Sequence, residues 1–318
     1  MSRLVEQVKL SLGDHISKFS PSKIVVAISG GADSVALFRA TQLALKDFDI
    51  SLELAHINHQ LRGKDSDDDQ KFVEKLAATH GVKLHIYSEN VAEFAKNNGL
   101  SVETAARQVR YKFLDEFKNS ALVATAHNAN DNAETVLLNL ARGTGLAGLC
   151  GIPQARGHYI RPLLKVSRSE IEKFLQEIAQ DFITDQTNFE EVYTRNNVRH
   201  NILPLFLELN PNFLNSIESL TSNLSADENY LQKQAEIGLK IVTKENNIDA
   251  KLLANLPQNI SYRIIKTLMQ SAGVAEFSQV HIGLIQEILS IGGAVNLPGD
   301  FFARVQKNVL TIYKNFKK

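Results

Sequence analysis

The first half of the chain alternates short apolar runs with amphipathic stretches, and this alternation limits the folds open to it. The predicted strands are Ile24–Ile28, Leu52–Ile57, Lys83–Tyr87 and Leu122–Thr125, with a fifth at Tyr159–Ile160. The predicted helices between them are Val35–Leu45, Asp67–His80, Val102–Phe117 and Glu134–Leu140. Strands that alternate with helices pair in parallel and carry helices on both faces. We therefore expect a doubly wound parallel α/β sheet, whose ligands bind beyond the carboxyl ends of its strands.

The pattern changes after the segment LELNPN (207–212), which contains Pro211 and reads as a hinge. The predicted elements that follow are helices at Leu214–Leu224, Glu228–Val242, Ile260–Gln270 and Val280–Leu289, then short β-like runs at Ala294–Leu297, Arg304–Val305 and Val309–Tyr313. A chain of 318 residues is long for a single core. We expect an α/β domain over residues 1–211 and a smaller, mainly helical domain over residues 212–318.

Charge and cysteine content exclude several classes of protein. The 35 Lys and Arg balance the 35 Asp and Glu, so only a local patch would attract nucleic acid. The single cysteine, Cys150, provides neither an internal disulfide nor a CxxC metal or redox motif. A polar start and the lack of a run of ~18 apolar residues predict a cytoplasmic protein without a membrane partner.

The stretch SGGADS (Ser29–Ser34) follows the first predicted strand and opens a helix. Its two glycines permit backbone angles that other residues avoid, so successive amides can point into one anion-binding concavity at the helix start. The absence of a lysine after the glycines distinguishes it from the common GxxxxGK[ST] loop. The alternative is a tight strand-to-helix turn in which Asp33 or Ser34 caps the helix.

This stretch resembles the SGGxDS signature of the PP-loop ATP pyrophosphatases, which cleave ATP between its α and β phosphates. The resemblance implies the PP-loop fold, similar to that of the adenine nucleotide α hydrolases, and ATP as a substrate. It also implies magnesium held by Asp33 and, from a later motif, Asp131. The residues of this stretch and of the strand before it that it places near ATP are Ala27, Ser29, Gly30, Gly31, Ala32, Asp33 and Ser34. Two further candidates for contact with ATP are His56, at the exit of the second strand, and Gly143, in RGTGLAGL. Their alternatives are a capping or core role for His56 and a helix exit for Gly143.

Further motifs resemble those of the tRNA(Ile)-lysidine synthetases, in the order of that family and over roughly residues 22–204. They are HINHQLRGKDSDDD (56–69), ETAARQVRYKFL (103–114), ATAHNANDNAETVLLNLARGTGLAGLCGI (124–152), RPLLKVSRSEI (161–171) and DQTNFEEVYTRNNVRHNILP (185–204). Two positions depart from the family pattern: Asn128 and Asn130 replace a histidine and an aspartate, and we assign them no function. Longer members have a further C-terminal domain, so we expect either a natural short form or a shortened piece of a longer chain.

The resemblance implies a ligase that joins free lysine to C2 of the wobble cytidine in isoleucine tRNA with a CAU anticodon. ATP adenylates the base and releases pyrophosphate, and lysine then displaces AMP. The helical domain is expected to bind the tRNA. The oligomeric state stays open, a homodimer included. A PP-loop tRNA thiolase is the nearest alternative, although one cysteine cannot supply the cysteines of the cytidine-thiolating type. The other alternative is a nucleotide-binding sensor without turnover.

Three side chains of the AHNANDNAE segment are candidate catalytic groups. If the helix begins near Asn130, ahead of its apolar stretch, Asp131 and Glu134 share one face, where they would bind magnesium or the ammonium of lysine. His127, just before that helix, would contact the α phosphate or the leaving oxygen. The alternatives are charge compensation at a helix N-terminus for Asp131 and a solvated position for Glu134.

Two pairs of arginines complete the candidate site. Arg107 and Arg110 lie one helical turn apart, and the resemblance marks Arg110 as the arginine of the reaction centre. A salt bridge to Glu103 is the alternative for Arg107. Arg195 and Arg199 are candidates for binding lysine, phosphate or the tRNA backbone, and a solvated basic face is their alternative.

Overall fold

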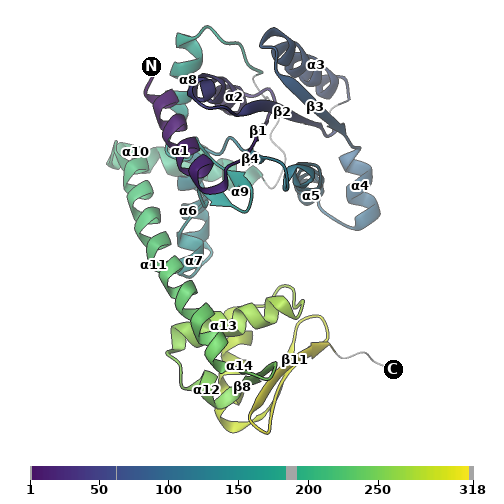
Figure 1. The fold of residues 1–318 in the computed structure, drawn as a ribbon, viewed down its shortest axis with the longest axis vertical. Coiled ribbons are helices and arrows are strands. Elements are labelled where there is room, and N and C mark those ends of the chain that lie inside the picture. The colour runs from purple at the N-terminus through teal and green to yellow at the C-terminus, as the bar shows by residue number, and fades with distance from the viewer. Residues whose placement is uncertain (1, 62, 184–191, 315–318) are drawn as a thin grey trace. The chain divides into compact units, whose positions relative to one another are not determined.

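The computed structural model describes residues 2–61, 63–183 and 192–314, and the chain forms two compact units, residues 1–222 and 223–318 (Figure 1). Helix α10 (Leu203–Leu209) ends before Pro211 and α11 (Phe213–Val242) begins after it. The division between units falls within α11, C-terminal to the boundary predicted at residues 211 and 212. The prediction of two helices in this stretch is wrong. No glycine or proline separates them, so the backbone hydrogen bonds continue.

The first unit contains a six-stranded sheet whose strands are parallel except at one edge. In spatial order they are β3 (Lys83–Ser88), β2 (Ser51–Asn58), β1 (Lys23–Ala27), β4 (Leu122–Ala124), β6 (Tyr159–Ile160) and the antiparallel β5 (Ala155–Arg156). The register pairs Val26 with Leu54 on one side and with Ala124 on the other. The predicted doubly wound sheet is confirmed.

Helices cover both faces of this sheet (Figure 1). On the face of Ile24 and Val26 lie α1 (Arg3–Phe19), α2 (Ala32–Ala44), α3 (Lys64–Thr79) and α8 (Arg168–Glu177). On the face of Val25 and Val123 lies α5 (Val102–Leu114), which packs with α4 (Val91–Asn98). Because alternate residues of a strand point to opposite faces and both are covered, the residues of β1 after Lys23 are all apolar.

The strand order brings β1 and β4 side by side, although about a hundred residues separate them. The chain leaves β1 toward β2 and returns to the other side of β1 with β4. In an open parallel sheet, such a change of direction leaves a crevice at the carboxyl ends of the strands. Two helices therefore begin next to each other there, α2 after β1 and α6 (Ala129–Ala141) after β4.

Shorter elements connect these parts. They are the 3-10 turns η1 (Leu45–Asp47) and η2 (Asp115–Phe117), the short helices α7 (Leu146–Leu149) and α9 (Val192–Asn197), and the π-helical turn η3 (Val198–Ile202). Helix α6 packs against α10 and α11 through Ala133, Val136, Leu203 and Ile217. None of the described helices combines the length and the hydropathy needed to cross a membrane.

The second unit packs helices against a small antiparallel sheet. Its helices after α11 are α12 (Ala250–Ala254), α13 (Gln258–Ser271) and α14 (Gln279–Ile291), and its strands in spatial order are β7 (Thr243–Lys244), β8 (Asn247–Asp249), β11 (Val309–Lys314), β10 (Phe301–Gln306) and β9 (Gly293–Leu297). The β-like runs predicted near the end of the chain are the strands β9, β10 and β11. Leu253, Ile264 and Ala303 are fully buried in the core of this unit.

Candidate active site

The segment Ser29–Ser34 forms a tight turn between β1 and α2, as its two glycines predict. The Ser29 amide donates to the Ser34 hydroxyl at 3.2 Å, and that hydroxyl donates to the Gly31 carbonyl at 2.9 Å. The Gly31 amide donates to the Ser29 hydroxyl at 3.4 Å. Ala32 opens α2, so the first amides of the helix have no carbonyl four residues earlier to bind. The turn thus offers backbone donors at the positive end of a helix, as a phosphate site does.

Gly30 is required for this turn by its backbone and by its surroundings. Its φ angle of +95° lies in the region that favours glycine. A Cβ atom at this position would lie 2.6 Å from Cδ1 of Ile183, whose amide donates to the Gly30 carbonyl at 2.9 Å. A larger residue would therefore strain the backbone and displace Ile183.

Asp33 lies at the start of α2 in a pair with Arg168, the first residue of α8. The distance from its Oδ2 to Arg168 Nη1 is 2.5 Å, and its Oδ1 is buried without a hydrogen-bond partner among the described residues. Burial raises the pKa of the Asp33 carboxyl; Arg168 opposes this rise and Asp131 adds to it. Asp33 and Asp131 are thus close enough to repel each other. The alternative role of Asp33 as helix cap does not hold, because Gly31 occupies the cap position.

The start of α6 is held by a capping box between Asn128 and Asp131. The Asn128 side chain accepts from the Asp131 amide at 3.0 Å, and the Asp131 carboxylate accepts from the Asn128 amide at 3.1 Å. This cap starts α6 at Ala129, five residues before the predicted start, since the polar first turn shows no apolar period. Asn130 accepts from the Arg168 amide at 3.0 Å and so ties α8 to α6. Both asparagines have structural contacts.

Glu134 is fully buried, so a solvated position, its alternative interpretation, is wrong. Two arginines compensate its charge: Arg199 Nε lies 2.6 Å from Oε1, and Arg195 Nε lies 3.1 Å from Oε2. Arg199 also binds Asp131 at 3.1 Å. Burial by itself lowers the pKa of Arg199, but the contacts with Glu134 and the charge of Asp131 raise it overall. The two arginines are bound to the acids of α6 and do not form a solvated basic face.

His127 follows β4 and lies among arginines. Its Nδ1 is 3.2 Å from the Thr125 hydroxyl. Burial, together with the charges of Arg161, Arg110, Arg195 and Arg107, lowers the pKa of His127 to about 4. The imidazole is therefore neutral near pH 7 and stands in a positive field that suits phosphate oxygens.

The predicted pair Arg107 and Arg110 does face this region. Both side chains reach solvent, but protein surrounds Arg110 closely enough that burial lowers the pKa of its guanidinium. The Arg107 guanidinium lies over the Tyr111 ring, 5.2 Å from its centre. Of the two, Arg110 exerts the larger effect on the pKa of His127.

His56 supports the turn from the neighbouring strand β2. Its Nδ1 donates to the Ile28 carbonyl at 2.9 Å, and its buried Nε2 has no partner among the described residues. Burial lowers the pKa of this ring, which is consequently neutral. Ala27, at the end of β1, and the buried Ala32 flank the turn.

Gly143 is the one predicted site residue that the structure does not bring to this cluster. It follows the C-terminal end of α6 with a φ angle of +72°, and the 13 residues of α6 put it ~20 Å from Asp131. Its amide donates to the Leu140 carbonyl at 3.0 Å, as expected of a glycine that ends a helix.

The sequence interpretation missed two arginines, Arg161 and Arg168. Arg161 is buried, donates to the Pro153 carbonyl at 2.7 Å and contributes most to the charge effect on His127. Both lie in RPLLKVSRSEI (161–171). This segment was included among the family motifs, but none of its residues was chosen as a candidate for the site. Its position after β6, the next strand beside β4, was the available signal. Residues 184–191, at the start of the last matching motif, lie outside the described residues.

Comparison with known proteins agrees with this geometry. A family model described as a PP-loop domain matches residues 4–206. The tRNA(Ile)-lysidine synthase of Caldanaerobacter subterraneus subsp. tengcongensis is 32% identical over 328 residues, which cover 99% of this chain and 70% of the relative. This chain belongs to the tRNA(Ile)-lysidine synthase family. Another member, from Bacteroides thetaiotaomicron, is 40% identical over 84% of this chain and 61% of the relative.

Among solved structures, a U34-tRNA thiolase from Methanococcus maripaludis that contains a [4Fe-4S] cluster has a similar fold. It superposes with a TM-score of 0.56 at 20% identity and covers 70% of this chain and 77% of the thiolase. This likeness concerns the fold alone. With the Clostridioides difficile member of the family, the chain shares 38% identity and spans 53% of the length of that relative. The chain thus spans about half to two thirds of several family members.

Proposed function

We propose that this protein uses ATP to ligate lysine to C2 of the wobble cytidine in isoleucine tRNA with a CAU anticodon, forming lysidine. The observation that carries the proposal is the meeting of two features at adjacent strand ends: the turn Ser29–Ser34 after β1, and the acids Asp131 and Glu134 after β4. The first suits a triphosphate, and the second suits a cationic amine. The names of the relatives supply the nature of the substrates.

In the first step, O2 of the cytidine attacks the α phosphorus of ATP, and the bond to the β phosphate breaks to release pyrophosphate. The amides of the turn would bind the departing phosphates. Arg110 and Arg161 would stabilise the negative charge that develops on the α phosphate. His127, which is neutral, would contact an α-phosphate oxygen or the oxygen that later leaves. The base must leave the anticodon stack to reach these groups.

In the second step, the amine of lysine attacks C2, and the bond from C2 to the oxygen breaks to release AMP. Glu134 and Asp131 would receive the ammonium group and accept its proton. In this structure their charges are compensated by Arg195 and Arg199, so the ammonium would take over contacts that guanidinium groups now make.

Two of the acids also fit magnesium. The buried Oδ1 of Asp33 has no hydrogen-bond partner in the part of the chain that the structure describes, and Asp131 lies close enough to raise the pKa of Asp33. Two carboxylates are an ordinary protein contribution to a magnesium ion that completes its shell with phosphate oxygens and water. When bound, the ion would neutralise phosphate charge.

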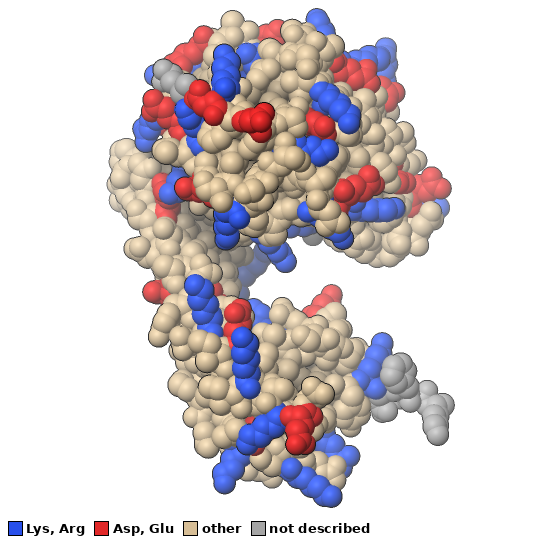
Figure 2. All heavy atoms as spheres, viewed as in Figure 1, with Lys and Arg blue, Asp and Glu red and all other residues tan. Residues whose placement is uncertain are grey.

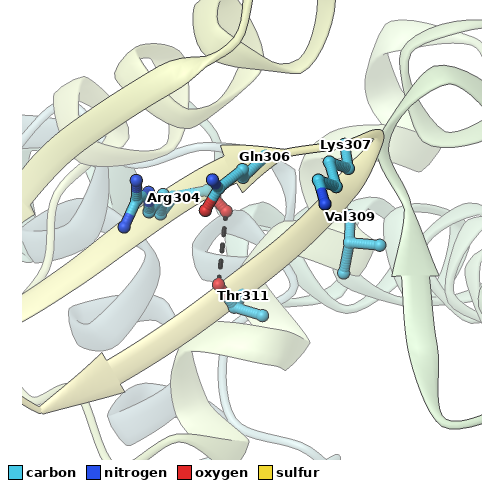
Figure 3. A pocket seen from close by; sticks show the side chains of 5 residues that line it. All are labelled: Arg304, Gln306, Lys307, Val309 and Thr311. Carbon is cyan, nitrogen blue, oxygen red and sulfur yellow. Dashed lines mark hydrogen bonds between the residues drawn. The ribbon is translucent and has the colours of Figure 1, made fainter.

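The second unit is proposed to bind the tRNA. Residues 223–318 contain eleven Lys and Arg against eight Asp and Glu, and residues 301–318 contain five basic residues and no acidic one. Figure 2 shows basic side chains along the edge of this unit. A pocket of about 340 Å³ lies on β10 and β11 between Arg304, Gln306, Lys307, Val309 and Thr311 (Figure 3). Lys317 and Lys318 lie outside the described residues.

Phe302 and Tyr313 stack on the same strands, with ring centres 6.0 Å apart. Tyr313 is 42% exposed. Exposed aromatic rings beside basic groups bind unpaired nucleotides. The face of β10 and β11 thus suits RNA better than an acidic protein partner, which would leave the rings unused.

Measurement of pyrophosphate and AMP release tests the function. The full chain is incubated with ATP, each amino acid in turn, and tRNA that includes the CAU-anticodon isoleucine species. We expect pyrophosphate release to require that tRNA, and AMP release to require lysine. Asp33→Ala should abolish pyrophosphate release. Binding of ATP without any turnover would favour a sensor, and incorporation of sulfur would favour a thiolase.

A further inference from the structure

Arg168 joins three segments of the candidate site and has no role in the proposed reaction so far. Its Nη1 donates to Asp33 at 2.5 Å, its Nε donates to Glu172 at 2.8 Å, and its backbone amide donates to the Asn130 side chain at 3.0 Å. The first contact reaches α2 and the third reaches α6. The guanidinium is thus held at the entrance of the phosphate-binding turn.

The contact with Asp33 adds little to folding stability. The Arg168 and Asp33 side chains are 42% and 28% exposed, and ion pairs with such access to water contribute about 0–1 kcal/mol. Its position has a clearer electrostatic consequence. The Asp33 carboxylate stands next to the amides that would bind phosphate, where an uncompensated negative charge would repel the ligand. Arg168 compensates that charge in the free protein.

We propose that Arg168 is a phosphate-binding residue, which Asp33 holds ready in the free protein and which binds a phosphate oxygen when ATP enters. This inference rests on the proposed function, because it requires that the turn binds ATP. A guanidinium suits the task, since it stays charged and its planar donors match phosphate oxygens. The hydrogen bond from the Arg168 amide to the Asn130 side chain keeps the start of α8 in place while the Arg168 side chain changes partner.

The chain offers a matched control in Arg3. It forms an ion pair with Glu170, also on α8, at 3.5 Å, and its side chain is 74% exposed. Arg3→Gln removes a guanidinium that pairs with a residue of α8, and Arg168→Gln removes a guanidinium that belongs to α8. Only the second removes a group that contacts Asp33.

The test is calorimetric titration of the full chain with ATP and with adenosine, for wild type, Arg168→Gln, Arg168→Lys and Arg3→Gln. We expect Arg168→Gln to weaken ATP binding about 10- to 100-fold, as for the loss of one hydrogen bond between charged groups. Adenosine binding should not change, since adenosine has no phosphate. Arg168→Lys should recover part of the affinity, and Arg3→Gln should bind ATP like wild type.

Steady-state pyrophosphate release separates a binding role from a merely structural one. Arg168→Gln should raise KM for ATP and leave KM for lysine unchanged, whereas a distorted site would raise both. Equal ATP affinity of wild type and Arg168→Gln would overturn this inference and leave the proposed function intact. Failure of the wild type itself to bind ATP would overturn both. Equal losses in Arg168→Gln and Arg3→Gln would also overturn the role of Arg168.

Discussion

The buried carboxylate of Glu134 allows two similar arginines to be compared within one chain. We predict that Arg199→Ala destabilises the first unit more than Arg195→Ala does. Arg199 donates to Glu134 at 2.6 and 3.1 Å and to Asp131 at 3.1 Å. Arg195 donates to Glu134 once, at 3.1 Å, and makes a long contact of 3.4 Å with Thr135. The two side chains are 47% and 43% exposed, so solvent access does not distinguish them.

The size of the effect follows from these contacts. Hydrogen bonds to charged groups contribute about 1.5–3 kcal/mol to stability, and half-exposed ion pairs contribute less. We therefore take about 1 kcal/mol for each hydrogen bond from an arginine to a carboxylate. The loss is then about 3 kcal/mol for Arg199→Ala and about 1 kcal/mol for Arg195→Ala. For a unit of this size these losses lower Tm by about 6–12 °C and about 2–4 °C. The double variant should lose more than the sum, since it leaves a buried charge unpaired.

Differential scanning calorimetry of the full chain at pH 7 measures these shifts. Leu253→Ala, at a fully buried position of the second unit, identifies the transition that belongs to residues 223–318. Equal shifts for the two arginine variants, or a larger one for Arg195→Ala, would refute the reasoning. So would a double variant whose loss is smaller than that of Arg199→Ala alone.

The other predictions concern pH, the phosphate-binding turn and tRNA. The pKa of His127 is about 4 in the folded chain and near 6.5 in the unfolded chain, so its contribution to stability falls as pH drops from about 6.5 to about 4. His127→Asn should therefore flatten the free energy of unfolding against pH over this range. An unchanged dependence on pH would contradict the lowered pKa of His127. Gly30→Ala should lower stability in urea unfolding by about 1–3 kcal/mol through its positive φ, and it should abolish ATP binding in calorimetry. The added change Ile183→Ala should restore neither stability nor ATP binding. Full restoration would show that only the contact of the new Cβ with Ile183 mattered. Arg304→Ala and Lys307→Ala should each weaken tRNA binding and make its salt dependence less steep in filter binding, and normal affinity in both would exclude this face of β10 and β11 from the tRNA site.

The sequence analysis predicted the longer strands of both sheets, but it did not predict α1, α4 and α8, although their apolar period is regular. The strand Tyr159–Ile160 has the predicted bounds. Most ends of the other predicted strands lie one residue from the predicted position or at it. Helix starts were predicted less well. The first turns of α2 and α6 are set by a glycine turn and by the capping box of Asn128, and neither contributes to an apolar stripe.

The candidate site was predicted as far as its residues lie in motifs at strand ends. Asp33, His127 and Asp131 lie at the ends of neighbouring strands because β1 pairs with β4; the sequence predicted their positions at strand ends but not this order of strands. The partners of the acids could not be predicted. Arg168 and Arg199 come from segments distant in sequence, and their contacts depend on how α8 and η3 pack on α2 and α6.

The most direct test of the account is a crystal structure of the full chain with an ATP analogue that resists cleavage between the α and β phosphates. We predict density for the β and γ phosphates over the amides of Gly30–Ser34, with the α phosphate toward His127. Density for the triphosphate elsewhere on the protein, with the turn after β1 unchanged and unliganded, would contradict the account.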